Sequence, residues 1–190
     1  MKHNIHSQHT KTILAKTLLS LLEKKSLSKI TVSELVTLCE INRKTFYYHF
    51  ADVYALFEWY LNEEIQKAID TVNPLKDINA TITYSIEYMN KNPYLYNSID
   101  NPIGRDKITR FLNKQIYPTV CEILTEMEKQ YQKELEVDFK EFLAKNLTRV
   151  TVLTIIDAIE NPDALNAERM KLYLSDVFHA SLAGFFKNYK

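Results

Sequence analysis

Residues 42–50, which read Asn-Arg-Lys-Thr-Phe-Tyr-Tyr-His-Phe, gather side chains that can donate hydrogen bonds. An arginine fork matches the acceptors on a guanine edge, and lysine or threonine can reach bases or phosphates. Tyrosine hydroxyls and an imidazole add further donors. Because Phe46 and Phe50 lie four residues apart, they share one face of a helix, and the polar residues point elsewhere. The segment therefore predicts a short helix with an apolar inner face and an outer face suited to a polyanion.

The preceding residues predict the element that would position this helix. Thr31 and Glu34 fit a capping box, in which hydroxyl and carboxylate each accept an orphan backbone N–H of a helix that runs to about Cys39. Asn42 can cap the next helix after a turn of about three residues. Two short helices joined in this way form a helix-turn-helix, whose second helix can enter the major groove of DNA.

The rest of the chain predicts only helices. Two Gly and five Pro in 190 residues leave little material for tight turns. Apolar residues recur every three or four positions, which is typical of helices. The predicted helices lie near residues 10–25, 31–39, 42–50, 52–72, 76–91, 94–99, 104–132, 137–159 and 165–188. The expected fold is all-α with about nine helices, and Pro118 should bend the long helix that contains it.

Charge divides the chain near residue 50. The net charge is zero, yet residues 1–50 carry eight Lys/Arg against three Asp/Glu, and residues 51–190 carry sixteen against twenty-one. A basic head on an acidic body predicts that only the head meets a polyanion. We therefore expect a DNA-binding domain over residues 1–50 and a larger partner domain over residues 51–190.

At this point the sequence resembles a known family. A Thr-Val pair at the start of the first short helix, followed by Thr-Phe-Tyr-x-His-Phe at residues 45–50, is similar to the signature of TetR-type regulators. The likeness is specific over residues 10–60, and the rest agrees in length, helicity and an apolar C-terminal pair. It implies a three-helix N-terminal bundle with the helix-turn-helix, and a helical domain over residues 51–190 for dimerisation and effector binding. The stretch from Asn42 to Trp59 resembles one subgroup, regulators similar to the activator of dihydroxyacetone kinase operons.

Carried over by position, the resemblance implies two sets of DNA contacts. The base-edge set is Arg43, Lys44, Thr45 and Tyr48, and the phosphate set is Thr31, Tyr47 and His49. Asn42 is a further DNA-binding residue, and Lys11 and Thr12 can touch the DNA backbone. Two positions depart from the family pattern. Glu40 stands where the turn usually has Gly, so a side chain with a Cβ and a negative charge must take an awkward backbone conformation close to DNA. Val53 replaces a Lys that often contacts phosphate.

The predicted helices near 137–159 and 165–188 are apolar around most of their circumference. One apolar face suits the core of a monomer, whereas two call for a partner. We expect a homodimer through these helices that presents two recognition helices to half-sites of a pseudo-palindromic operator in double-stranded DNA. A small-molecule effector or a partner protein would bind the body, with repression as the default outcome and activation as the alternative.

The remaining candidate sites have simpler explanations. Trp59, Tyr84, Tyr88 and Phe111 could line a ligand pocket between helices, although aromatic side chains as a group usually form core. His3, His6 and His9 have a spacing that metal sites use, but a disordered N-terminal arm is the expected state, and no metal or cofactor is predicted. Cys39 and Cys121 stand alone and are expected to be buried thiols.

Two other functions compete with that of a regulator. A small all-helical enzyme would need a catalytic constellation, and the sequence offers none with supporting context, so the chain is predicted not to be an enzyme. A helical protein-interaction module with a degenerate DNA-binding head is the main alternative, because of Glu40 and Val53. No apolar stretch approaches the ~20 residues of a membrane span, so we expect no membrane association and a cytoplasmic location.

Overall fold

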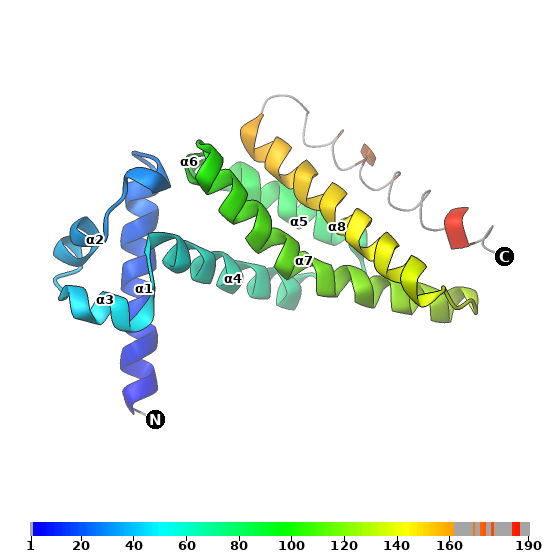
Figure 1. Ribbon diagram of the computed structural model, residues 1–190, viewed down its shortest axis with the longest axis horizontal. Helices are drawn as coiled ribbons and strands as arrows, with labels where there is room; N and C mark the ends of the chain where they lie inside the picture. Colours follow the sequence, from blue (N-terminus) through cyan, green and yellow to red (C-terminus); the bar gives the residue numbers. More distant parts are fainter. Residues whose placement is uncertain (1, 162–168, 170–171, 174–175, 177–183, 187–190) are drawn as a thin grey trace. The chain divides into compact units, whose positions relative to one another are not determined.

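The computed structural model describes residues 2–161, with side chains from Ser7 onward, together with Arg169, Leu172, Tyr173, Asp176 and residues 184–186. Within these residues the chain forms eight α-helices and two short 3-10 helices, and no strand (Figure 1). The all-α class expected from the scarcity of glycine is confirmed. The helix predicted near 165–188 falls mostly outside the described residues.

The helices follow the predicted order. They are α1 (Lys2–Leu22), η1 (Leu27–Lys29), α2 (Val32–Leu38), α3 (Arg43–His49), α4 (Val53–Thr71), α5 (Ile78–Lys91), η2 (Pro93–Leu95), α6 (Tyr96–Ile99), α7 (Pro102–Tyr131) and α8 (Val137–Glu160). The main difference is α1, which begins at Lys2 rather than near residue 10. The expectation of a disordered N-terminal arm is therefore wrong. Neither Gly nor Pro occurs before residue 20, and nothing therefore interrupts the helix towards its N-terminus. Helix α7 continues through Pro118.

Contacts divide the chain into two compact units. Unit 1 comprises Met1–Ile65 and Pro93–Ile108, and unit 2 comprises Gln66–Asn92 and Thr109–Lys190. A segment from the middle of the sequence therefore packs with the N-terminal helices. The boundary near residue 50 between a DNA-binding domain and a partner domain stays a prediction, because packing does not test which residues would contact DNA.

The N-terminal head, which we define as α1 to α3, is built on one apolar stripe of α1. Leu14, Leu18 and Leu22 follow each other at four-residue intervals, and all three are fully buried. Helix α1 contacts α2, and α2 contacts α3, so the three form a small bundle (Figure 1). Each fully buried leucine contributes about 1.5 to 3 kcal/mol of burial free energy, which favours packing of α1 against its neighbours.

The segment Pro93–Ile108 is fastened to the head by polar contacts. The Asn97 side-chain amide donates to the Leu22 carbonyl at 2.7 Å and so satisfies an orphan acceptor at the end of α1. The Ser26 hydroxyl donates to the Asp100 carboxylate. The segment also contacts α4, since the hydroxyls of Tyr60 on α4 and Tyr94 lie 3.0 Å apart. Helix α6 also contacts η1, so this segment belongs structurally to the end of the head where α1 stops.

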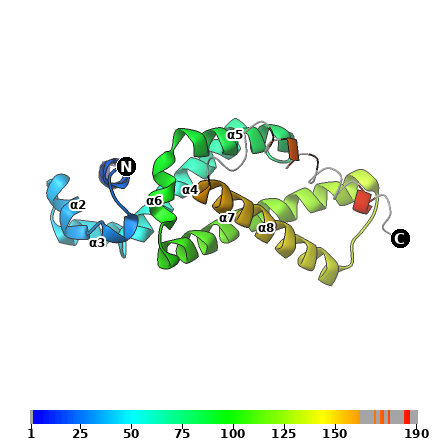
Figure 2. The same ribbon diagram turned by 90° about the horizontal axis from the view of Figure 1, so that it is seen from above.

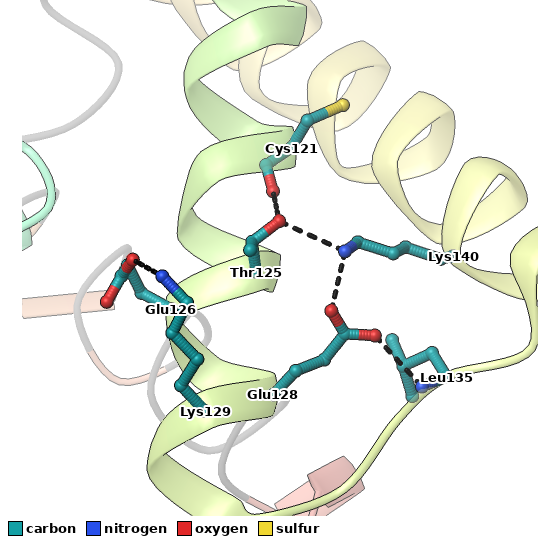
Figure 3. Close-up of polar contacts among 7 residues, drawn as sticks. All are labelled: Cys121, Thr125, Glu126, Glu128, Lys129, Leu135 and Lys140. Atoms are coloured by element: carbon teal, nitrogen blue, oxygen red, sulfur yellow. Dashed lines mark hydrogen bonds and ion pairs between the residues drawn. The ribbon is translucent and has the colours of Figure 1, made fainter.

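Unit 2 contains a second core between α7 and α8, which cross each other in Figure 2. Its buried residues are Val120, Leu124, Leu135, Ala144 and Phe186. Beside this core, Lys140 Nζ lies 2.5 Å from a Glu128 carboxylate oxygen and 3.0 Å from the Thr125 hydroxyl. The other Glu128 oxygen accepts the Leu135 backbone N–H at 2.9 Å (Figure 3). One carboxylate thus ties both helices and the loop between them together.

None of the helices in the described part of the chain combines the length and the apolar character that crossing a membrane requires.

Candidate nucleic-acid interface

Helix α2 begins at a partly confirmed capping box. The Thr31 hydroxyl accepts the Glu34 backbone N–H at 3.2 Å, as the sequence predicted. The Glu34 carboxylate does not complete the box, and instead accepts Lys25 Nζ with both oxygens, at 2.6 and 2.7 Å. A hydrogen bond between two charged groups is stronger than one from a neutral backbone N–H, which explains the preference. The pair fixes the start of α2 to the loop that follows α1.

The turn between α2 and α3 contains the strained residue that the family resemblance led us to expect. Glu40 has a φ of 54°, in the left-handed region. The Ile41 N–H donates to the Val36 carbonyl at 3.0 Å, and the Glu40 N–H donates to the Thr37 carbonyl at 3.3 Å. These two bonds form a Schellman motif, which closes a helix and normally has glycine at the left-handed position. The geometry expected of a glycine turn is therefore kept, with a carboxylate at its apex.

Replacing Glu40 with glycine is expected to stabilise the protein by about 0.5 to 1 kcal/mol, because relief of left-handed strain exceeds the entropic cost of glycine. Glu40→Ala removes the charge but keeps the Cβ, so it should not stabilise. Gln132, with a φ of 52°, offers a matched control, since Gln132→Gly should stabilise comparably without changing DNA affinity. Urea denaturation gives the free energy of unfolding of all three variants. Equal stabilisation by Glu40→Ala would show that charge, and not backbone strain, is responsible.

Helix α3 is capped and anchored as predicted. The Asn42 side-chain oxygen accepts the Thr45 backbone N–H at 2.8 Å and the Thr45 hydroxyl at 3.1 Å. Phe46 is fully buried and Phe50 is 6% exposed, so both rings point into the head. Their burial fixes which face of α3 remains outside.

The outer face of α3 presents four side chains to solvent. They are Arg43, Lys44, Tyr47 and Tyr48. Tyr48 is 71% exposed, although a tyrosine ring gains free energy from burial. The head therefore brings together most of the side chains predicted to contact DNA, while the contacts themselves stay a prediction.

Arg43 is held by neighbours on two helices. Its Nη1 donates to the Ser33 hydroxyl of α2 at 3.2 Å, and its Nη2 donates to the Tyr47 hydroxyl at 3.2 Å. The guanidinium carbon also lies 5.5 Å from the centroid of the Tyr47 ring. Sequence spacing carries no signal for Ser33, because the contact joins residues of different helices without a recurring interval.

His49 lies at the end of α3 beside Lys11 of α1. Partial burial lowers the pKa of the imidazole below its ordinary 6.5, and the positive charge of Lys11 lowers it further. The neutral imidazole, which this favours near pH 7, keeps one N–H donor, and its predicted contact with a phosphate stays a prediction. Thr12, the other α1 residue expected near the DNA backbone, is exposed, and its hydroxyl donates to the Gln8 carbonyl at 2.9 Å.

Val53 departs from the family pattern, and its burial accounts for the apolar residue at this position. It is 7% exposed and belongs to the apolar core, so the position faces inward in this chain. A cation lies nearby all the same, because Lys107 Nζ is 3.3 Å from the Asp52 carboxylate and 4.0 Å from the centroid of the Tyr54 ring. The sequence could not indicate Lys107, which is distant along the chain.

The residues predicted for a ligand pocket fall in different units. Trp59 lies in unit 1, where its ring centroid is 5.8 Å from that of Phe50 and 5.6 Å from Lys11 Nζ. Tyr84 and Tyr88 are half-buried on α5, and Phe111 is buried on α7, all in unit 2. The pocket stays a prediction, and packing within unit 1 accounts for the position of Trp59.

The cysteines and histidines form no evident metal site in the described part of the chain. Cys39 and Cys121 are free thiols that are half-buried rather than fully buried. His9 is exposed, and the side chains of His3 and His6 lie outside those described. Among the described side chains, no group of three or more His, Cys, Asp or Glu residues could hold a metal ion.

Comparison with known proteins supports the fold. No family model matches the chain, and no curated protein sequence does. Among solved structures, the dihydroxyacetone kinase operon activator DhaS superposes with a TM-score of 0.68 at 17% identity, covering 92% of this chain and 96% of that one. A TetR transcriptional regulator from Streptococcus agalactiae 2603V superposes with a TM-score of 0.59 at 19% identity, covering 91% and 95%. The chain therefore has the all-α fold of TetR-type regulators.

Proposed function

We propose that this protein is a sequence-specific DNA-binding transcriptional regulator with α3 as its recognition helix. The observation that carries the proposal is the two-sided character of α3. Phe46 and Phe50 anchor its inner face, and its outer face offers Arg43, Lys44 and the two tyrosines to solvent. Such a helix, held after a capped turn at the basic end of the chain, suits docking in a major groove. The likeness in fold to two regulators supports this proposal and the resemblance to the DhaS subgroup.

The regulator would act as a homodimer on a pseudo-palindromic operator. Helix α8 buries Ala144, Val152 and Ile156 on one side, and exposes Val150 and Leu153 by 60% and 48% on another. Exposed β-branched and aliphatic residues on a helix that already has a core face favour a second copy as partner. The other half of the proposed interface, residues 165–188, falls mostly outside the described residues.

A small molecule or a partner protein in the C-terminal domain would control DNA binding by preferring one of two conformations. We keep repression as the default, with activation as the alternative that the name of the DhaS neighbour favours. The protein would act without catalysis, and in the cytoplasm, where the DNA is.

One observation favours the second candidate function, a protein-interaction module with a degenerate head. Glu40 places a carboxylate at the turn, where a DNA backbone would approach, and repulsion between like charges weakens docking. Arg43 and Lys44 stand three and four residues after Glu40 and offset its charge, so the DNA-binding function is the better supported of the two.

Selection from a pool of randomised DNA duplexes tests the proposal, because the selection itself identifies the operator sequence. The parent chain should enrich an inverted repeat whose half-sites are centred about 10 base pairs, or a multiple of a helical turn, apart. Arg43→Ala should lose base preference at one position of each half-site and keep it elsewhere. Failure to enrich any sequence, with the chain folded, would favour the interaction module.

A further inference from the structure

The fixed orientation of Arg43 is the feature that goes beyond a generic basic helix. A surface arginine normally samples many rotamers, and ordering it on binding costs free energy. Here two contacts from different helices already restrain the guanidinium group, Ser33 on α2 and Tyr47 one turn further along α3. The end of the side chain is therefore ordered before any ligand arrives.

The restraint leaves Arg43 able to read a base. A guanidinium group has five N–H donors, and the bonds to the two hydroxyls use one on Nη1 and one on Nη2. Three donors remain, and a bidentate contact to guanine needs two. The Tyr47 ring, 5.5 Å from the guanidinium carbon, supports the group from its face without using a donor. Both Ser33 and Arg43 are exposed, so this arrangement lies on the outer surface of the head.

We propose that Ser33 is a positioning residue that sets the specificity of DNA recognition through Arg43. Its hydroxyl fixes the fork in one direction relative to α2, so that a guanine at one position of the half-site meets an ordered pair of donors. Preorganisation of this kind strengthens binding to the matching base and leaves contacts with phosphates unchanged. This role rests on the proposed function and adds a residue of α2 to its specificity.

A double-mutant cycle tests the role. The probe is the tightest duplex that the parent chain recovers from the randomised pool, beside the same duplex with the Arg43-dependent base pair exchanged. Ser33→Ala should weaken binding to the first duplex about 3- to 10-fold and leave binding to the second nearly unchanged. In the Arg43→Ala background, Ser33→Ala should have no further effect, because the group that it orders is gone. Ser33→Thr, which retains a hydroxyl, should restore most of the preference.

A measurement without DNA separates this inference from the proposed function. In the free protein, the rotation of the Arg43 guanidinium group, followed by nitrogen NMR, should be slow in the parent and faster in Ser33→Ala. Slow rotation in the parent that Ser33→Ala leaves unchanged would overturn the positioning role, whatever the DNA result. If rotation responds as expected and the parent enriches no duplex, the proposed function fails, and with it the role of Ser33 in specificity. Equal losses from Ser33→Ala on both duplexes would also overturn that role.

Discussion

Replacing Phe46 with alanine is expected to destabilise the head by about 3 to 5 kcal/mol, the range for removing a buried aromatic ring. The ring is fully buried and has aromatic neighbours, with centroids 5.6 Å from that of Tyr47 and 6.0 Å from that of Phe50. No rearrangement of so short a helix can refill that volume. Trp59, the single tryptophan of the chain, lies against Phe50, so its fluorescence reports the unfolding of this region in urea.

Tyr48→Ala is the matched control on the same helix. Its side chain is 71% exposed, so the unfolding free energy should change by no more than about 0.5 kcal/mol. DNA affinity should nevertheless fall, because this tyrosine belongs to the proposed base-edge set. A large loss of stability in Tyr48→Ala, or a near-neutral effect in Phe46→Ala, would contradict the assignment of inner and outer faces of α3.

Replacing Lys140 with methionine is expected to destabilise the protein by about 1 to 3 kcal/mol, because it leaves a mostly buried carboxylate without its cation. The Glu128 side chain is 14% exposed and that of Lys140 is 28% exposed. Burial alone would raise the pKa of Glu128, but the hydrogen bond from Lys140, the Leu135 N–H and the charge of Lys140 together lower it below its ordinary 4.5.

The pH dependence of the Lys140 effect follows from this lowered pKa. A carboxyl whose pKa is lower when folded stabilises the fold above about pH 4.5, and that stabilisation is lost as the pH falls through the folded pKa. The difference in unfolding free energy between the parent and Lys140→Met should therefore be largest near neutral pH and shrink below pH 4.5. Lys145→Met breaks the exposed Lys145–Glu141 pair on the same helix and should cause no measurable change. Equal effects of the two variants, or a difference that does not depend on pH, would contradict this account.

Short-range pattern in the sequence predicts a large part of the fold. Helix order, the Asn42 cap and the inward rings of Phe46 and Phe50 all follow from spacing of three or four residues. The left-handed backbone at Glu40 was expected from the family resemblance, which marks this turn position as one that usually has glycine. The predicted start of α1 is wrong, since a polar composition does not oppose a helix where neither glycine nor proline interrupts it.

What the sequence could not predict depends on contacts between distant residues. The attachment of Pro93–Ile108 to the head, through Asn97 and Leu22 among others, joins segments that share no periodicity. The competition of Lys25 for the Glu34 carboxylate, and the hold of Ser33 on Arg43, arise only when α2 packs against its neighbours. These contacts decide how the head presents its outer face, so the detail of the proposed DNA-binding face could not be predicted from the sequence.

The central claim is that the outer face of α3 recognises DNA, and fluorescence anisotropy across a salt series tests it most directly. The labelled probe is the selected duplex, titrated with the parent chain, Arg43→Ala and Tyr48→Ala. The account predicts that the parent binds tightly and weakens steeply as salt increases, and that each substitution erodes the preference for this duplex over a scrambled one by about 1 to 3 kcal/mol. Binding of the folded parent that is weak, indifferent to sequence and unaffected by either substitution would contradict it.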